Sequence, residues 1–210
     1  MASLRMSPAR FLTVVLTALL VVLSAGCGKA EKEQAPATAD APKTEAVSPA
    51  PASDEIPAGW VEYGSEPHGF TILTPKSFDV SHDVTQTEAG DIALTTYLAE
   101  MGKVAYGVTC NDFPEALVQG KNAEALIKGG SEGMVNQFAG TVTGEQVLEL
   151  NGNPGLEIAL NGTTQGVKIF AKGRIYLVGT RMYQIFVFAE EEAKDLPVID
   201  RFLRSFKLKT

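Results

Sequence analysis

The sequence VKIFAKGRIYLVGTRMYQIFVF, residues 167–188, identifies the type of fold that this chain adopts. It holds two stretches, 167–178 and 182–188, rich in the β-branched and aromatic residues that are typical of strands. A short turn with a glycine, residues 179–181, separates them. Consecutive strands joined by so short a turn pair antiparallel, so the sequence predicts an antiparallel hairpin.

The residues before this hairpin predict further strands by alternation of apolar and polar side chains. Turn-forming residues separate these strands, at Gly102, at 151–155 and at Asn161-Gly162. The predicted strands begin at Phe70 and stop before Pro75, and then cover 92–98, 104–110, 142–150 and 156–160. Together they predict an antiparallel meander within one domain, residues 57–210.

Two segments change to helical spacing. The first covers residues 123–138, although Gly129, Gly130 and Gly133 weaken its middle. The second is amphipathic and ends the chain, with acidic residues 190–192 before it and basic residues after it, which complements a helix dipole. A solvated helix start explains the acidic residues better than a cation site does. The apolar face of this last helix consists of Leu196, Ile199, Phe202, Leu203 and Phe206. The predicted fold class is therefore α+β, an antiparallel sheet meander with helices packed on it.

Four further cues carry a resemblance to a known fold. They are Trp60 before the first strand, GFTI at 69–72 with Pro75 after it, RMY at 181–183, and RFLRSFKL at 201–208. In this order they resemble the α/β/α sandwich of PsbP, of the Ran-binding Mog proteins and of DcrB-like bacterial lipoproteins. The resemblance implies a fold over residues 60–210. Members differ in role, from supporting photosynthetic water oxidation to binding a GTPase, so it implies no functional residue.

The N-terminus has the layout of a secretory signal peptide, residues 1–26. Arg5 and Arg10 precede an uncharged apolar run at 11–23, and small residues follow it. This run is shorter than the about 20 apolar residues that a spanning helix needs, so a transmembrane helix is the weaker interpretation.

The residues Ser24-Ala25-Gly26-Cys27 resemble a lipobox, in which the cysteine receives a diacylglycerol before cleavage and an acyl chain such as palmitate afterwards. More than one chain is needed for stable anchoring. The prediction is a lipid attachment at Cys27; ordinary secretion with a free thiol is the alternative. In such lipoproteins, a residue other than aspartate after the cysteine implies the outer membrane. Gly28 therefore predicts an outer-membrane protein facing the periplasm, with the inner membrane as the alternative.

Residues 27–56 form the predicted linker, disordered and rich in alanine and proline. As a flexible coil it would span about 30 Å, so it serves as a spacer from the lipid surface. A proline-rich ligand or a segment that follows peptidoglycan is the functional alternative. Without residues 1–26 the chain keeps 16 basic and 25 acidic residues, a net charge of −9. This charge argues against nucleic acid and against an anionic bilayer surface as partners.

Sequence motifs for catalysis are incomplete. Ser131 lies in a G-x-S-x-G pattern, but a predicted helix precedes it where a hydrolase needs a strand. Gly120-Lys121-Asn122 matches only the end of a phosphate-binding loop and lacks its hydroxyl residue. His68 and His82, the only histidines, fall in predicted surface loops without the spacing of a zinc site.

The remaining cysteine and the aromatic residues are predicted to belong to the core. Cys110 alternates with Val104, Tyr106 and Val108, which favours a buried small apolar residue over a redox centre. A second set of aromatic residues could line a ligand pocket between sheet and helix, but such residues are more often core. This set is Tyr176, Tyr183, Phe186 and Phe188.

The sequence thus names no catalytic, cofactor-binding or metal-binding residue, and Cys27 is its single site. The leading hypothesis is a membrane-anchored envelope lipoprotein, not an enzyme, whose domain binds an unknown envelope protein or assists assembly. The alternative is a carrier or sensor of a small apolar ligand. A hydrolase built on His68 or His82 is the third hypothesis.

Overall fold

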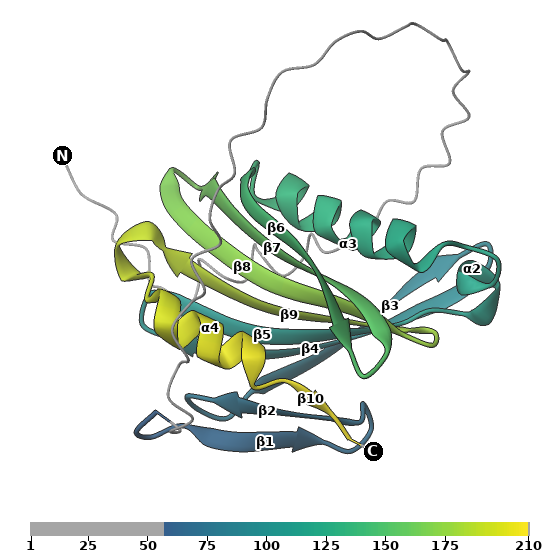
Figure 1. Cartoon of the computed structure of the whole chain (residues 1–210), viewed down its shortest axis with the longest axis horizontal. Coiled ribbons are helices and arrows are strands. Elements are labelled where there is room, and N and C mark those ends of the chain that lie inside the picture. The colour runs from purple at the N-terminus through teal and green to yellow at the C-terminus, as the bar shows by residue number, and fades with distance from the viewer. Residues whose placement is uncertain (1–56, 210) are drawn as a thin grey trace, which may run out of the picture.

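The computed structural model describes residues 57–209. The predicted signal peptide, Cys27 and the linker lie outside these residues. Figure 1 shows the described chain as a large twisted sheet that has a helix on each face and a small sheet beside one of them. The α+β fold class predicted from the sequence is confirmed.

The large sheet has seven strands, all antiparallel, in the order β3-β4-β5-β9-β8-β7-β6. The predicted meander is therefore present as two pieces, β3 to β5 and β6 to β9, which meet at the β5–β9 pair. Helix α3 lies in the connection between the two pieces. The strands are β3 (Asp79–Thr87), β4 (Gly90–Met101), β5 (Val104–Asp112), β6 (Thr141–Leu150), β7 (Asn153–Thr164), β8 (Val167–Val178) and β9 (Arg181–Glu190).

The small sheet joins the two ends of the domain. Strand β2 (Phe70–Thr74) pairs with β1 (Val61–Ser65) on one side and with β10 (Lys207–Leu208) on the other. The first strand predicted from the sequence is thus β2. It does not belong to the meander as expected, because its two neighbours come from opposite ends of the domain.

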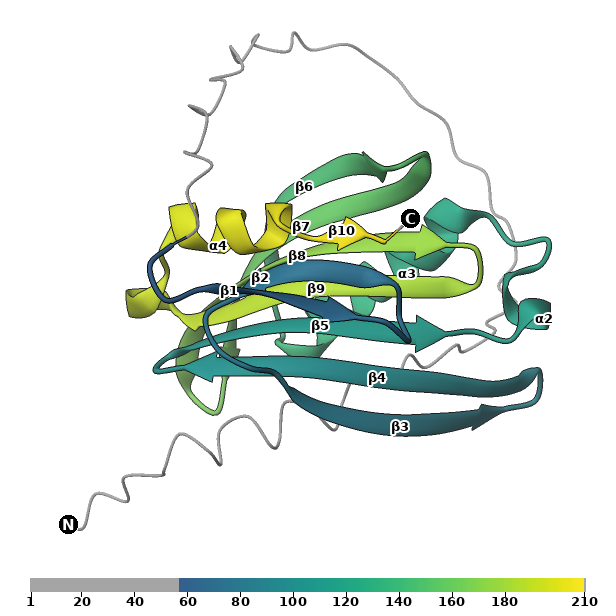
Figure 2. The ribbon, with the colours of Figure 1, turned by 90° about the horizontal axis from the view of Figure 1, so that it is seen from below.

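The helices cover opposite faces of the large sheet, as the two views in Figures 1 and 2 show. Helix α3 (Ala123–Gln137) buries Ile127 and Met134 against β7, β8 and β9. Helix α4 (Leu196–Arg204) and the small sheet cover the other face. A short helix α2 (Glu115–Val118) and a 3₁₀ turn at Glu191–Ala193 complete the described chain.

Two predicted boundaries are wrong. Asn161-Gly162 lies inside β7 and forms no turn; the β7–β8 turn is at Gln165-Gly166, where both residues have positive φ. Gly162 is needed for a close approach instead, since an added Cβ would lie 2.6 Å from the backbone oxygen of Phe138. The last helix ends at Arg204, two residues before Phe206, which the sequence places on its apolar face.

The apolar face of α4 also differs at one position. Leu196 is largely exposed, although Ile199, Phe202 and Leu203 are buried as predicted. Phe206 follows the helix and stacks on Phe70 of the small sheet. It therefore joins the core from the connection between α4 and β10.

Candidate functional site

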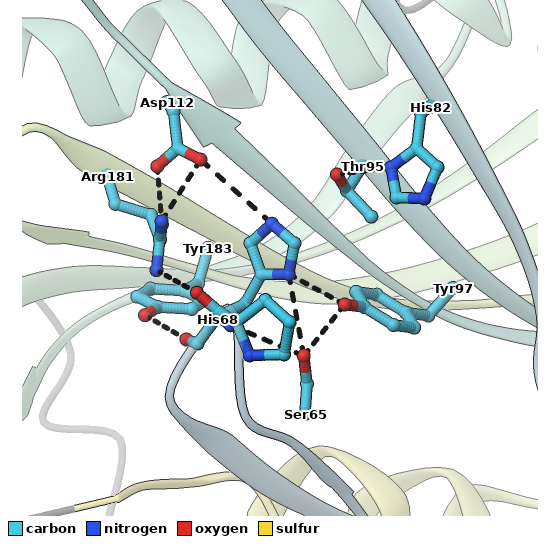
Figure 3. Close-up of polar contacts among 9 residues, drawn as sticks. Ser65, His68, His82, Thr95, Tyr97, Asp112, Arg181 and Tyr183 are labelled. Carbon is cyan, nitrogen blue, oxygen red and sulfur yellow. Dashed lines mark hydrogen bonds and ion pairs between the residues drawn. The ribbon is translucent and has the colours of Figure 1, made fainter.

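A chain of buried polar side chains connects the β1–β2 turn to the large sheet (Figure 3). The hydroxyl of Tyr97, on β4, lies 2.7 Å from Nδ1 of His68 and 2.8 Å from Oγ of Ser65. Ser65 also accepts a hydrogen bond of 3.4 Å from the backbone N–H of His68. Ser65 is 3% exposed and His68 is 8% exposed. These groups satisfy one another with little contact with solvent.

The other side of His68 faces an ion pair. Nε2 of His68 lies 4.0 Å from Oδ2 of Asp112, and Asp112 holds the guanidinium of Arg181 with two hydrogen bonds. Burial is the main influence on His68 and lowers its pKa; the charge of Arg181 lowers it further, while Asp112 opposes both. A neutral imidazole with its proton on Nε2 fits this arrangement, since Nδ1 then accepts from Tyr97.

The same network holds the backbone of the turn. The hydroxyl of Tyr183, on β9, donates to the backbone oxygen of His68 at 2.6 Å. Arg181 reaches the backbone oxygen of Pro67 at 3.4 Å. Strands β4, β5 and β9 therefore all contribute side chains that bind this one turn. We call the six side chains the clasp: Ser65, His68, Tyr97, Asp112, Arg181 and Tyr183.

The clasp contains a serine, a histidine and an aspartate, so its geometry bears on the hydrolase hypothesis. Oγ of Ser65 is 3.4 Å from His68 and closer to Tyr97, and the imidazole is 4.0 Å from Asp112. A substrate would also have to displace the β1–β2 turn to reach a serine that is 3% exposed. This arrangement suits a structural link between the sheets.

The structure corrects the prediction that both histidines lie in surface loops. His68 is in a loop but is buried, because the turn folds onto the large sheet. His82 is exposed but lies on strand β3, with Nδ1 at 3.0 Å from the hydroxyl of Thr95. Within residues 57–209 no group of three or more potential metal ligands occurs.

Cys110 and Ser131 lie where the sequence places them. Cys110 is fully buried in β5, and burial raises the pKa of its thiol to about 12, which keeps it protonated and unreactive. Ser131 is buried inside α3 and donates to the backbone oxygen of Lys128 at 2.8 Å. Its helical context lacks the sharp strand-to-helix turn of a hydrolase.

The four aromatic residues considered for a ligand pocket divide between two faces of the sheet. Tyr176 and Tyr183 pack with Phe206 on the α4 side. Phe186 and Phe188 pack with Phe138 on the α3 side. They are core residues and do not line one common pocket.

A second polar cluster, which sequence reasoning missed, lies on the α4 side of the sheet. Glu157 on β7 lies 3.0 Å from Lys172 and 2.7 Å from Arg174, both on β8. Lys172 also binds Asp200 of α4 at 2.6 Å. The four charges balance, and the cluster ties α4 to the sheet. Only the alternation of Lys172 and Arg174 with apolar residues in β8 hints at inward-facing charges.

The exposed apolar side chains gather at the two edges of the large sheet. Four of the seven large ones belong to the edge strands, Val80 and Val84 to β3 and Val142 and Val147 to β6. The other three are Val61, Met101 and Leu196. In the part of the chain that the structure covers, no helix is long and apolar enough to cross a bilayer.

Comparison with known proteins yields similarity in structure only. No family model matches the chain, and no curated protein matches it significantly. Cyanobacterial PsbP (CyanoP) from Synechocystis sp. PCC 6803 is similar with a TM-score of 0.49 and 11% identity, over 72% of this chain and 93% of that one. A protein of unknown function, PA94 from Pseudomonas aeruginosa, is similar with a TM-score of 0.36 and 7% identity, over 67% and 88%. At these values no function is transferred to this chain.

Proposed function

We propose that this chain is a lipid-anchored lipoprotein of the cell envelope, without catalytic activity, whose folded domain binds another envelope protein. Cys27 in its lipobox carries the anchor, and Gly28 favours the outer membrane facing the periplasm over the inner membrane. As a flexible coil, a linker of residues 27–56 would hold the domain about 30 Å from the lipid surface.

One observation carries the binding part of this proposal: strand β6 is an open edge. It ends the strand order, pairs with β7 alone among the described strands, and residues 141–147 are all exposed. Exposed edges invite pairing with another chain. An extended segment can bind such an edge through its backbone.

The test is photo-crosslinking in intact cells of the source organism. A photoreactive amino acid at Val147 should give a discrete adduct with one envelope protein, because this side chain is 81% exposed on β6. The same amino acid at Lys121, exposed in the loop before α3, is the control and should give none.

The anchor is tested in the same cells. Cys27→Ser should move the protein from the membrane fraction to the soluble fraction and weaken the adduct, since the domain is no longer held near its partner. A variant that stays in the membrane fraction would contradict the lipid anchor. Absence of any adduct from Val147 and from Val84 of the opposite edge would contradict the binding function.

A further inference from the structure

The regular part of β6 is long enough to receive another strand. A bulge interrupts its register with β7 between Val142 and Gly144. From Glu145 to Leu150 the register is continuous, and half of the backbone groups of such an edge strand point away from its single neighbour. An incoming strand could pair with these unpaired backbone groups without interruption by a bulge.

The two faces of this segment differ. Gln146, Leu148 and Leu150 point to the α4 side, where Leu148 and Leu150 already pack against the core. Glu145, Val147 and Glu149 point to the other side, and all three are exposed. A second strand would therefore meet three free side chains on this second face, and only Gln146 on the first.

The register confirms which face this is. Glu145 is opposite Ile158 and Val147 is opposite Leu156, and both partners pack beneath α3. Helix α3 itself does not cover Val147, which is 81% exposed. The free face thus presents an acidic, an apolar and an acidic side chain at successive same-face positions.

This pattern disfavours a second copy of the chain. In the antiparallel register that pairs Val147 with its own copy, Glu145 lies opposite Glu149 on both sides. Like charges directly opposite each other on paired strands destabilise the pair. The pattern instead complements a strand with an apolar residue flanked by basic residues two positions away on each side.

Resting on the proposed function, we propose that β6 binds by strand addition an extended segment of a partner protein with the pattern basic-x-apolar-x-basic. The apolar residue lies against Val147, and the two basic residues lie against Glu145 and Glu149. The net charge of −9 of the chain from Cys27 onward adds attraction at longer range.

The experiment measures binding of labelled peptides to the full chain in detergent, by fluorescence anisotropy at low salt. The probe is Thr-Thr-Lys-Thr-Val-Thr-Lys-Thr-Thr. One comparison peptide has glutamate in place of both lysines, and another has each lysine moved next to the valine, onto the opposite face. The probe should bind at least about tenfold more tightly than either, because it alone forms both cross-strand ion pairs.

Charge reversal on the protein identifies the edge. The double variant Glu145→Lys/Glu149→Lys should prefer the glutamate peptide over the probe. The matched double variant Glu124→Lys/Glu132→Lys makes the same change of charge at exposed positions of α3 and should keep the original preference.

Equal binding of the three peptides, or an unchanged preference in the β6 variant, would overturn the inference. A dimer in sedimentation that Val147→Glu dissociates would also overturn it, by assigning the edge to a second copy. The two proposals fail separately. A cellular adduct at Val147 without a peptide preference would support the binding function and contradict the proposed partner chemistry. A peptide preference without a cellular adduct would contradict the binding function.

Discussion

Tyr97 is the side chain on which the buried polar groups of the clasp depend. Its hydroxyl accepts from Ser65 while it donates to Nδ1 of His68, and both partners are buried. Within residues 57–209, neither partner has an alternative side-chain acceptor or donor at a comparable distance, since the direct contact of Ser65 with His68 is 3.4 Å. The loss of a single oxygen would therefore leave two buried groups poorly satisfied.

Tyr97→Phe should lower the free energy of unfolding by about 1–3 kcal/mol, the usual cost of leaving buried polar groups unsatisfied. Chemical denaturation measures it. The matched control is Tyr106→Phe, which removes the hydroxyl of an equally buried tyrosine that makes no side-chain hydrogen bond within residues 57–209. Equal losses in the two variants would show that the clasp contributes nothing beyond packing.

For single residues, the sequence predicts the burial of apolar side chains better than the burial of polar ones. The alternation around Cys110 correctly predicts a buried thiol, because a period of two reports which face of a strand a residue occupies. The burial of His68 could not be predicted. It depends on Tyr97, 29 positions away, and on a turn folding over another sheet.

Helix α4 attaches to the sheet through both apolar and ionic contacts. Its apolar side chains enter the core, while Asp200 joins Lys172 and, through it, Glu157. Burial alone would raise the pKa of Glu157, but the hydrogen bonds and charges of Lys172 and Arg174 together outweigh it and lower that pKa. Glu157 is thus the carboxylate that pairs with both Lys172 and Arg174 of β8.

Glu157→Gln should lower the free energy of unfolding by about 2 kcal/mol, less than for a fully buried pair because these side chains keep some contact with water. Thermal unfolding at pH 7 measures it. Glu190→Gln breaks the exposed pair with Lys103 and should change the melting temperature little. A Glu157→Gln variant as stable as the original would mean that packing alone holds α4.

The elements that escaped sequence prediction are those without a buried face. Strand β3 has only two apolar residues, Val80 and Val84, four positions apart and both exposed. Strand β1 ends on the buried polar Ser65. Strands β8 and β9 were predictable because both of their faces lie in the core, which imposes a continuous run of apolar and aromatic residues.

The whole domain consists of two sheets that share one core. The small sheet packs Phe70 and Ile72 onto the same cluster that receives α4. The clasp adds the polar connection between the sheets. Sequence alternation could not reveal this arrangement, because it reports faces of strands and not which sheet a strand joins.

Because the clasp holds His68 with a lowered pKa, acid should destabilise the domain. The unfolded chain binds a proton at His68 near pH 6.5 and the folded chain only at lower pH. The contribution of His68 to the free energy of unfolding is therefore fully present above pH 6.5 and is lost as the pH falls below it. In a plot of the free energy of unfolding against pH, this one residue adds a slope of at most about 1.4 kcal/mol per pH unit. Denaturation midpoints at successive pH values measure it.

His68→Gln should remove that part of the slope. His82→Gln removes the exposed imidazole on β3, the smallest of the influences on the pKa of His68, and should leave most of the slope. The difference between the variants isolates His68 from the carboxylates, which titrate at lower pH. Parallel curves for all three proteins would show that His68 is equally protonated in the folded and unfolded chains.

Strand β1 also determines how the domain responds to force. Tension that arrives from the N-terminal side enters at Val61. Among the described strands β1 pairs with β2 alone, over five residue pairs, and Ser65 at its end also binds Tyr97 of β4. This one ladder, with the rings of Trp60 and Tyr63, carries the load before the seven-stranded sheet does. If β1 yields first, it releases roughly 17 Å of extended chain while the large sheet stays intact. The domain would then lengthen by this fixed amount under tension before its main sheet is loaded.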